Sequence, residues 1–143
     1  MSLVAMSPLL RRALTADAVV SLAAGFAMTL GADLLSPWLR LPTSLLLAAG
    51  LSLFPWAGFL MWLARKPAVP RAAIWTVLAI NALWIVESAW VAVGGQFSPS
   101  GWGLAFIAAQ ALGVLVLLEL EFMGACAGPA SPPPDRGALS SGR

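Results

Sequence analysis

The sequence predicts an all-α, polytopic membrane protein, an antiparallel bundle of four transmembrane helices with both termini in the cytoplasm. Hydrophobic residues make up 60% of the chain and charged residues only 10%, whereas a soluble domain carries about 25% charged residues. The apolar residues fall into four long runs, and the basic residues lie in the loops and at the ends. Lipid is therefore the expected solvent for most of the surface.

Three segments divide the chain. Residues 1–12 are predicted to be a cytoplasmic N-terminal lead, residues 13–124 a four-helix transmembrane domain, and residues 125–143 a disordered cytoplasmic tail rich in Pro, Ser and Gly. Each predicted span has about 20 residues, enough to cross a hydrocarbon core of about 30 Å at about 1.5 Å per residue. The four spans cover residues 14–35, 44–64, 72–94 and 102–123.

Helix-breaking residues separate these spans in order. Pro37 and Pro42 end the first run, because proline cannot continue a helix without losing a hydrogen bond. A basic connector, 65–71, with two prolines separates the second run from the third. An uncharged connector, 95–101, begins and ends with glycine and precedes the fourth run. Such short connections predict that sequential helices are antiparallel neighbours.

Basic residues predict the orientation. If the four spans cross the membrane, only Arg40 falls on one side and all other Lys and Arg residues fall on the opposite side. Cytoplasmic loops carry the excess of Lys and Arg, so both termini are expected in the cytoplasm. The dominance of Arg over Lys, with abundant Ala and Leu, suggests a GC-rich bacterium and therefore its inner membrane. The majority side holds Arg11, Arg12, Arg65, Lys66, Arg71, Arg136 and Arg143.

The composition also excludes several kinds of chemistry. The chain has no His, so Ser-His-Asp and Cys-His triads and ordinary zinc sites cannot form. Its single cysteine, Cys126, cannot form an internal disulfide. The basic residues do not make one continuous face, so nucleic acid is not an expected partner. We therefore predict no enzymatic activity, no cofactor and no metal site.

A set of polar and aromatic residues in the third and fourth spans forms a candidate intramembrane cluster. Glu87 is predicted to lie roughly 10 Å below the outer boundary, where a carboxylate must be protonated, paired or in contact with water. It is either a coupling carboxylate of a transporter or a hydrogen-bonded group that joins helices. The cluster comprises Asn81, Trp84, Glu87, Ser88 and Gln110.

A second set of charged residues is predicted at the cytoplasmic ends of the spans. Asp17 falls near the start of the first span, and Glu119 and Glu121 fall near the end of the fourth. These acidic groups are expected to form interface ion pairs with basic residues such as Arg71. Asp17, Ser21 and Gly25 are also spaced by four, which gives the first helix a stripe of small and polar residues suited to close helix contact with a partner.

The chain resembles small, uncharacterised four-helix bacterial integral membrane proteins and is loosely similar to the DoxX-like group in size and layout. The resemblance covers residues 11–124, and it implies no catalytic residue. Small multidrug transporters also have four helices and a membrane-embedded Glu, but theirs lies in the first helix. The resembling residues are Asp17, Ser21, Leu41, Pro42, Gly50 to Pro55, Asn81, Trp84, Ser88, Gln110, Ala111 and Glu119.

Two functions follow from these observations. The first expectation is a structural or accessory component of a membrane complex, with the lipid bilayer and a homo-oligomer or larger complex as its surroundings. The alternative is a minimal homo-oligomeric transporter of a small or lipophilic solute, with Glu87 as the proton- or cation-coupling carboxylate. A transporter of four helices has little interior of its own, which is why the alternative includes an oligomer.

Overall fold

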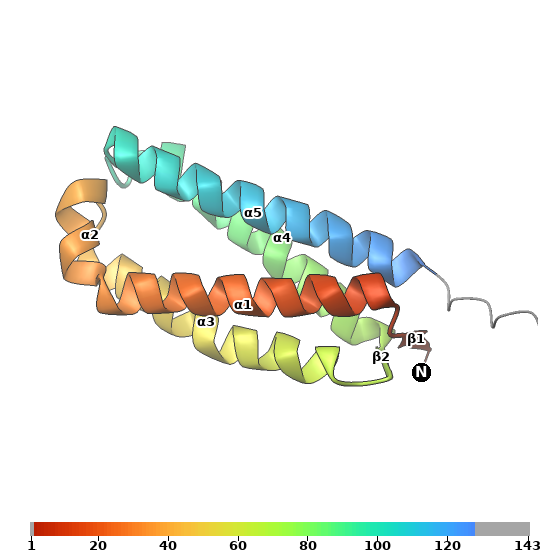
Figure 1. Cartoon of the computed structure of the whole chain (residues 1–143). Helices are drawn as coiled ribbons and strands as arrows, with labels where there is room; N and C mark the ends of the chain where they lie inside the picture. The colour runs from red at the N-terminus through yellow and green to blue at the C-terminus, as the bar shows by residue number, and fades with distance from the viewer. Residues whose placement is uncertain (1, 128–143) are drawn as a thin grey trace, which may run out of the picture.

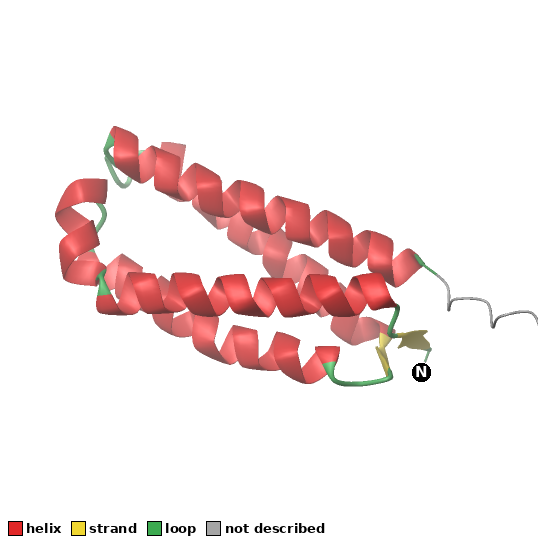
Figure 2. Ribbon diagram, viewed as in Figure 1, coloured by secondary structure: helices red, strands yellow, loops and turns green. Residues whose placement is uncertain are grey.

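A computed structural model describes residues 2–127 of the chain, and these form five helices and two short strands (Figure 1). The fold is helical apart from one two-stranded ladder (Figure 2). The predicted all-α class is confirmed at this level. In chain order the elements are β1 (Leu3–Ala5), α1 (Pro8–Leu30), α2 (Ala32–Leu39), α3 (Thr43–Ala64), β2 (Ala68–Pro70), α4 (Arg71–Val93) and α5 (Gly101–Cys126).

Helices α1, α3, α4 and α5 are long and apolar enough to cross a membrane. They have 22 to 26 residues and windows of mean hydropathy between 1.6 and 2.1. Many of their large apolar side chains are exposed, for example Val86 and Trp90 on α4. Such surface is unfavourable in water and suited to lipid, which indicates a multi-pass membrane protein.

The first helix begins earlier than the sequence pattern predicted. Pro8 occupies the first turn, and the Ser7 hydroxyl accepts a hydrogen bond from the Leu10 amide at 3.1 Å. This pair is a favourable helix start, because serine caps a free amide and proline needs no donor there. The helix ends at Leu30, and the separate helix α2 replaces the predicted end of the first span and the loop after it.

The predicted N-terminal lead and the basic connector contain the two strands. β1 pairs antiparallel with β2, and Val4 lies opposite Val69, which is 1% exposed. The ladder closes one end of the molecule, here called the strand end, while α2 lies at the opposite end, the α2 end (Figure 1). The predicted tail lies outside the described residues from position 128 onward, and its first residues belong to α5.

Helix α1 occupies the centre of the packing. It lies along both α3 and α5, and α4 packs against α5. Within residues 2–127, α3 and α4 make no extensive contact with each other. The two helices are therefore held by their other neighbours, and a space remains between them.

Glycines allow α1 and α3 to approach closely. A Cβ atom at Gly50 would lie 2.6 Å from the Thr29 hydroxyl oxygen and 3.1 Å from the Gly25 carbonyl oxygen. Larger residues cannot occupy this contact without moving a helix. The stripe of small residues on α1 therefore packs partly against α3 of the same chain. This corrects the expectation that Gly25 faces a partner.

A second close contact joins the start of α1 to the end of α5. A Cβ atom at Gly124 would lie 2.6 Å from the Leu10 nitrogen. The Ser7 hydroxyl donates a hydrogen bond of 2.7 Å to the Gly124 carbonyl oxygen. These contacts determine how far α1 is shifted along α5.

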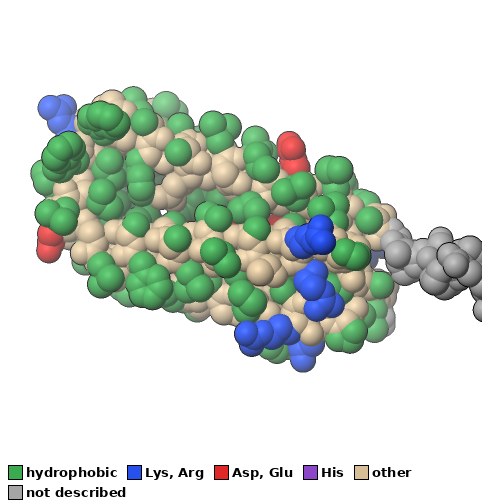
Figure 3. Space-filling model, viewed as in Figure 1, with side chains coloured by type: hydrophobic (Ala, Val, Ile, Leu, Met, Phe, Trp, Pro, Cys, Tyr) green, Lys and Arg blue, Asp and Glu red, His purple; other side chains and the backbone are tan. Residues whose placement is uncertain are grey.

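The exposed basic side chains are concentrated at the two ends of the molecule. Lys and Arg side chains gather near the strand end in the view of Figure 3, with one basic group at the α2 end. Arg11, Arg12, Arg65 and Lys66 are all exposed, as is Arg40 at the C-cap of α2. The lateral surface between these ends is largely apolar, as a membrane-spanning region requires.

The α1–α3 contact predicts a large effect of a side chain at Gly50. We expect Gly50→Leu to lower the free energy of unfolding by about 1–3 kcal/mol, because the added atoms overpack the helix interface. Gly58→Leu is the matched control, since Gly58 is on the same helix with nothing within 4 Å of an added Cβ. Denaturant titration in micelles measures both. Equal stability of the two variants would contradict the close contact.

Candidate functional site

A buried polar cluster joins α1, α4 and α5. Asp17 on α1 is 1% exposed, Asn81 on α4 is 3% exposed, and Glu121 on α5 is fully buried. Ser21, one turn after Asp17, is also buried. Buried carboxyl groups in a membrane-spanning helix are costly, so they mark a candidate functional site.

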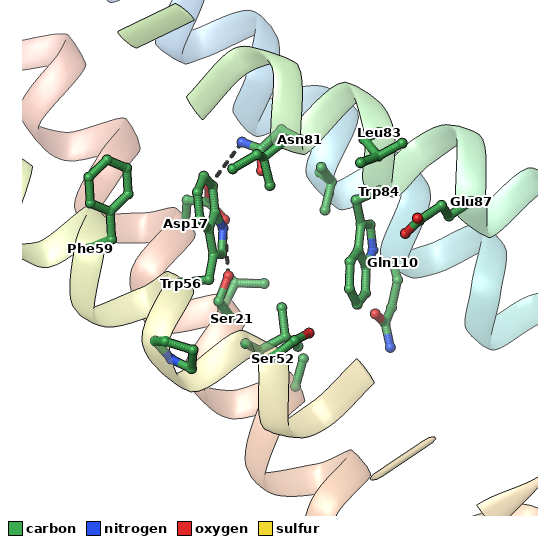
Figure 4. Close-up of a pocket in the computed structure, with 16 residues that line it drawn as sticks. Asp17, Ser21, Ser52, Trp56, Phe59, Asn81, Leu83, Trp84, Glu87 and Gln110 are labelled. Carbon is green, nitrogen blue, oxygen red and sulfur yellow. Dashed lines mark hydrogen bonds between the residues drawn. The ribbon is translucent and has the colours of Figure 1, made fainter. Parts of the chain in front are cut away.

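The side-chain amide of Asn81 bridges the two carboxyl groups. Its Nδ2 atom donates to Asp17 Oδ2 and to Glu121 Oε2, both at 3.0 Å. The Ser21 hydroxyl donates to Asp17 Oδ1 at 3.2 Å, as Figure 4 shows together with the bond from Asn81 to Asp17. Both protons of the amide are thus used, one for each carboxyl group.

The cluster contains acidic groups without a basic partner. Glu121 Oε1 is buried and has no hydrogen-bond partner in the structure. Within residues 2–127, Asp17 and Glu121 bond to Asn81 and Ser21 and to no Lys or Arg. Two ionised carboxylates that share one amide repel each other strongly in an apolar environment. The arrangement is therefore suited to binding a proton or another positive group.

The close contact at Gly124 places the two carboxyl groups together. Asp17 is seven residues after Leu10, two turns along the same face of α1, and Glu121 is three residues before Gly124 on α5. Both residues lie on the same side of the contact between Leu10 and Gly124, and their carboxyl groups are within reach of the one Asn81 amide. Asn81 completes the cluster from the buried face of α4.

A cavity of about 480 Å³ lies beside the cluster, with Asp17, Ser21 and Asn81 in its wall. Figure 4 shows these residues on one side of the space and Trp84, Glu87 and Gln110 on the other. Residues of α3, including Trp56 and Phe59, complete the lining. The cavity lies where α3 and α4 do not pack against each other.

A second cavity of about 560 Å³ continues toward the α2 end. Trp84, Glu87 and Gln110 line both cavities and so form the wall between them. The indole Nε1 of Trp84 is buried and has no hydrogen-bond partner. The two spaces therefore form a row along α4, with an unpaired donor between them.

The predicted intramembrane cluster lines these cavities, but its members do not bond to one another. Asn81 lies in the first cavity and Ser88 in the second. The side-chain Nε2 of Gln110 lies 3.5 Å from the Met28 sulfur. Glu87 is exposed at the edge of both cavities. Asn81 bonds instead to Asp17 and Glu121, which the sequence pattern had placed at the cytoplasmic ends of the spans.

The predicted interface ion pairs are replaced by the buried cluster. Asp17 and Glu121 are bonded to Asn81, while Arg71 and Glu119 are exposed. The difference arises because α1 begins at Pro8, so that Asp17 lies about two and a half turns inside the helix. The spacing of Asp17, Ser21 and Gly25 on one face was the signal that Asp17 is buried.

Residues 2–127 contain no group of three or more His, Cys, Asp or Glu side chains arranged to hold a metal ion. Comparison of the chain with protein-family models, with curated proteins and with solved structures finds no match. The chemistry of the site therefore has to be inferred from its own residues. The arrangement combines an apolar cavity, aromatic walls and acidic groups able to accept a hydrogen bond or a positive charge.

The bridging amide should be important for stability. We expect Asn81→Leu to lower the free energy of unfolding by about 1–3 kcal/mol, because it removes the donor to Asp17 Oδ2 and to Glu121 Oε2, both of which are buried. Thr76→Ala is the control on α4, since the Thr76 hydroxyl is exposed and bonds only within its own helix. Equilibrium unfolding in micelles gives both values. An Asn81→Leu variant as stable as the control would show that the bridge contributes little.

Proposed function

We propose that the chain is a multi-pass protein of a bacterial inner membrane, an antiparallel bundle with both termini in the cytoplasm. The support is the charge distribution: the strand end has five exposed basic residues in or next to the terminal turns of helices, and the α2 end has Arg40. The five are Arg11, Arg12, Arg65, Lys66 and Arg71. An excess of Lys and Arg faces the cytoplasm in such proteins. In this proposal the strand end is cytoplasmic and the α2 end faces the periplasm.

We further propose that the protein binds and transports a small lipophilic solute. The observation that supports this most directly is the cavity of about 480 Å³ beside Asp17 and Asn81. A mostly apolar cavity with a few converging polar groups is the usual form of a small-molecule site. The solute would sit between α3 and α4, with its apolar part against Trp56 and Phe59 and its polar part at Asp17.

This proposal shifts the polar recognition from Glu87 to Asp17. Glu87 is exposed at the edge of both cavities, whereas Asp17 is buried at the inner wall of the first. Residues of one chain line the cavity, so its walls do not require a second subunit. The proposal still includes a homo-oligomer, because one chain of four spanning helices has little interior for a path across the whole membrane.

An accessory role in a membrane complex is the second candidate, and the space between α3 and α4 supports it as well. The space between α3 and α4 extends over both cavities and is lined mainly by apolar side chains. A helix of a larger complex would bury this surface by close packing. In either role we propose a protein without enzymatic activity, with a layout similar to that of DoxX-like proteins.

The orientation can be tested with Cys126, which is exposed and is the only cysteine of the chain. We expect a membrane-impermeant maleimide to label Cys126 only after the cells are permeabilised. Cys126→Ala combined with Ser98→Cys is the matched probe, because Ser98 lies exposed in the connector at the other end. Labelling of Cys126 in intact cells would reverse the proposed orientation.

Solute binding can be tested by filling the cavity. We expect Ala24→Phe to lower the uptake of lipophilic solutes into proteoliposomes by at least about tenfold, a loss of about 1.4 kcal/mol in binding, because its ring occupies the first cavity. Ala23→Phe is the control, since Ala23 is exposed and outside the lining. Unchanged uptake in the filled variant would reject the transport proposal. Stoichiometric purification with a foreign membrane subunit would favour the accessory role.

A further inference from the structure

We infer that the carboxyl pair of Asp17 and Glu121 takes up an organic monocation in exchange for a proton. The inference rests on the proposed function, since it names the class of solute that the first cavity binds. It also assigns Asp17 the contact with the solute and Glu121 a supporting role behind it.

The charges around the cavity have one sign. The lining includes the carboxyl groups of Asp17 and Glu87, and it includes no Lys or Arg. Glu121 lies next to this wall, within hydrogen-bond distance of Asn81. A positive solute gains from the acidic groups in a medium of low dielectric constant, whereas an anion would meet carboxylates only.

Aromatic side chains also line the cavity. The rings of Trp56 and Phe59 on α3 lie 5.8 Å apart between centroids and are tilted by 37°, and both line the cavity together with Trp84 on α4. Aromatic faces attract cations, most strongly where water is excluded. An organic cation with an apolar body can use both features, while a hydrated metal ion would have to give up its water for apolar contacts.

The shared amide implies that a proton occupies the empty site. Two carboxylates, each 3.0 Å from one amide nitrogen and without a basic partner, cannot both be charged at low energy. A proton held by the pair offsets this repulsion. When the cation binds, its positive charge takes that role, and the proton leaves for bulk water.

The titratable groups near the pair come from three helices. α1 contributes Asp17, α4 contributes Glu87 across the cavity, and α5 contributes Glu121. The residues of α3 that line the cavity carry no titratable side chain, and Glu119 on α5 is exposed. The exchange therefore depends on the carboxyl pair, with Glu87 as the other acid that the experiment has to separate.

The test uses two probes of nearly equal shape, phenyltrimethylammonium and its neutral counterpart tert-butylbenzene. Binding to the purified full chain in nanodiscs is measured by calorimetry between pH 5 and pH 8.5. Exchange for one proton predicts that the cation Kd rises by up to about tenfold for each unit by which the pH is lowered. The Kd of the neutral probe should not change with pH, which also corrects for partitioning into lipid.

Three variants assign the effect to the pair. Asp17→Asn and Glu121→Gln are each expected to weaken cation binding by at least tenfold, about 1.4 kcal/mol, with the neutral probe unaffected. Two variants are used because either alone could fail to fold, which gel filtration detects. Glu119→Gln is the matched control, an exposed acid two residues from Glu121 on the same helix. It should bind both probes like the natural chain.

The outcomes separate the inference from the proposed function. Cation binding that does not vary with pH, or equal binding of both probes, would overturn the exchange and leave a site for neutral solutes. If Glu87→Gln abolishes the pH dependence and the two pair variants keep it, the exchange belongs to Glu87 and the inference is rejected. Binding of neither probe, together with unchanged uptake by the cavity-filling variant, would reject the proposed function as well.

Discussion

The close contact between Leu10 and Gly124 is the constraint on which the buried site depends. An added Cβ at Gly124 would meet the Leu10 backbone, so α1 and α5 touch there with no side chain between them. This contact sets the position of Asp17 relative to Glu121, and Asn81 then reaches both carboxyl groups. Backbone contact is a stiffer constraint than side-chain packing, because a backbone cannot change rotamer. The Ser7 hydroxyl, bonded to Gly124, holds the same contact from the helix cap.

The unequal packing of the helices explains why a cavity can exist in so small a protein. α1 packs against both α3 and α5, whereas α3 and α4 make no extensive contact with each other. In water such a gap would collapse or fill, but in a membrane there is no hydrophobic force that drives apolar helices together. The cavities beside Asp17 and Trp84 are therefore compatible with a stable structure. In the proposed function the solute occupies this surface, and the acidic groups in its wall are the reason for proposing a positively charged one.

The sequence predicted the helices better than the site. Long apolar runs separated by prolines and glycines located α3, α4 and α5 to within a few residues, because length and hydropathy alone are decisive in lipid. The start of α1 was misplaced, since the cap formed by Ser7 and Pro8 lies in a segment that hydropathy assigns to the aqueous lead. As a result, Asp17 was predicted at the cytoplasmic interface, whereas in the structure its side chain is buried in the protein interior. Glu121 was misplaced with it, because the end of α5 at Cys126 is three residues later than expected.

The sequence by itself determined the class of the protein, the number of long apolar helices and the presence of acidic groups within them. Those properties follow from composition and periodicity, which need no knowledge of neighbouring helices. Only the tertiary structure decided which acidic groups meet, since helix register depends on glycine contacts between segments far apart in sequence. It also decided that Asn81 serves as the bridge and that α3 and α4 leave a cavity between them. Partner choice of this kind is not encoded in any one helix, because each buried face fits several neighbours and the whole set of contacts selects one.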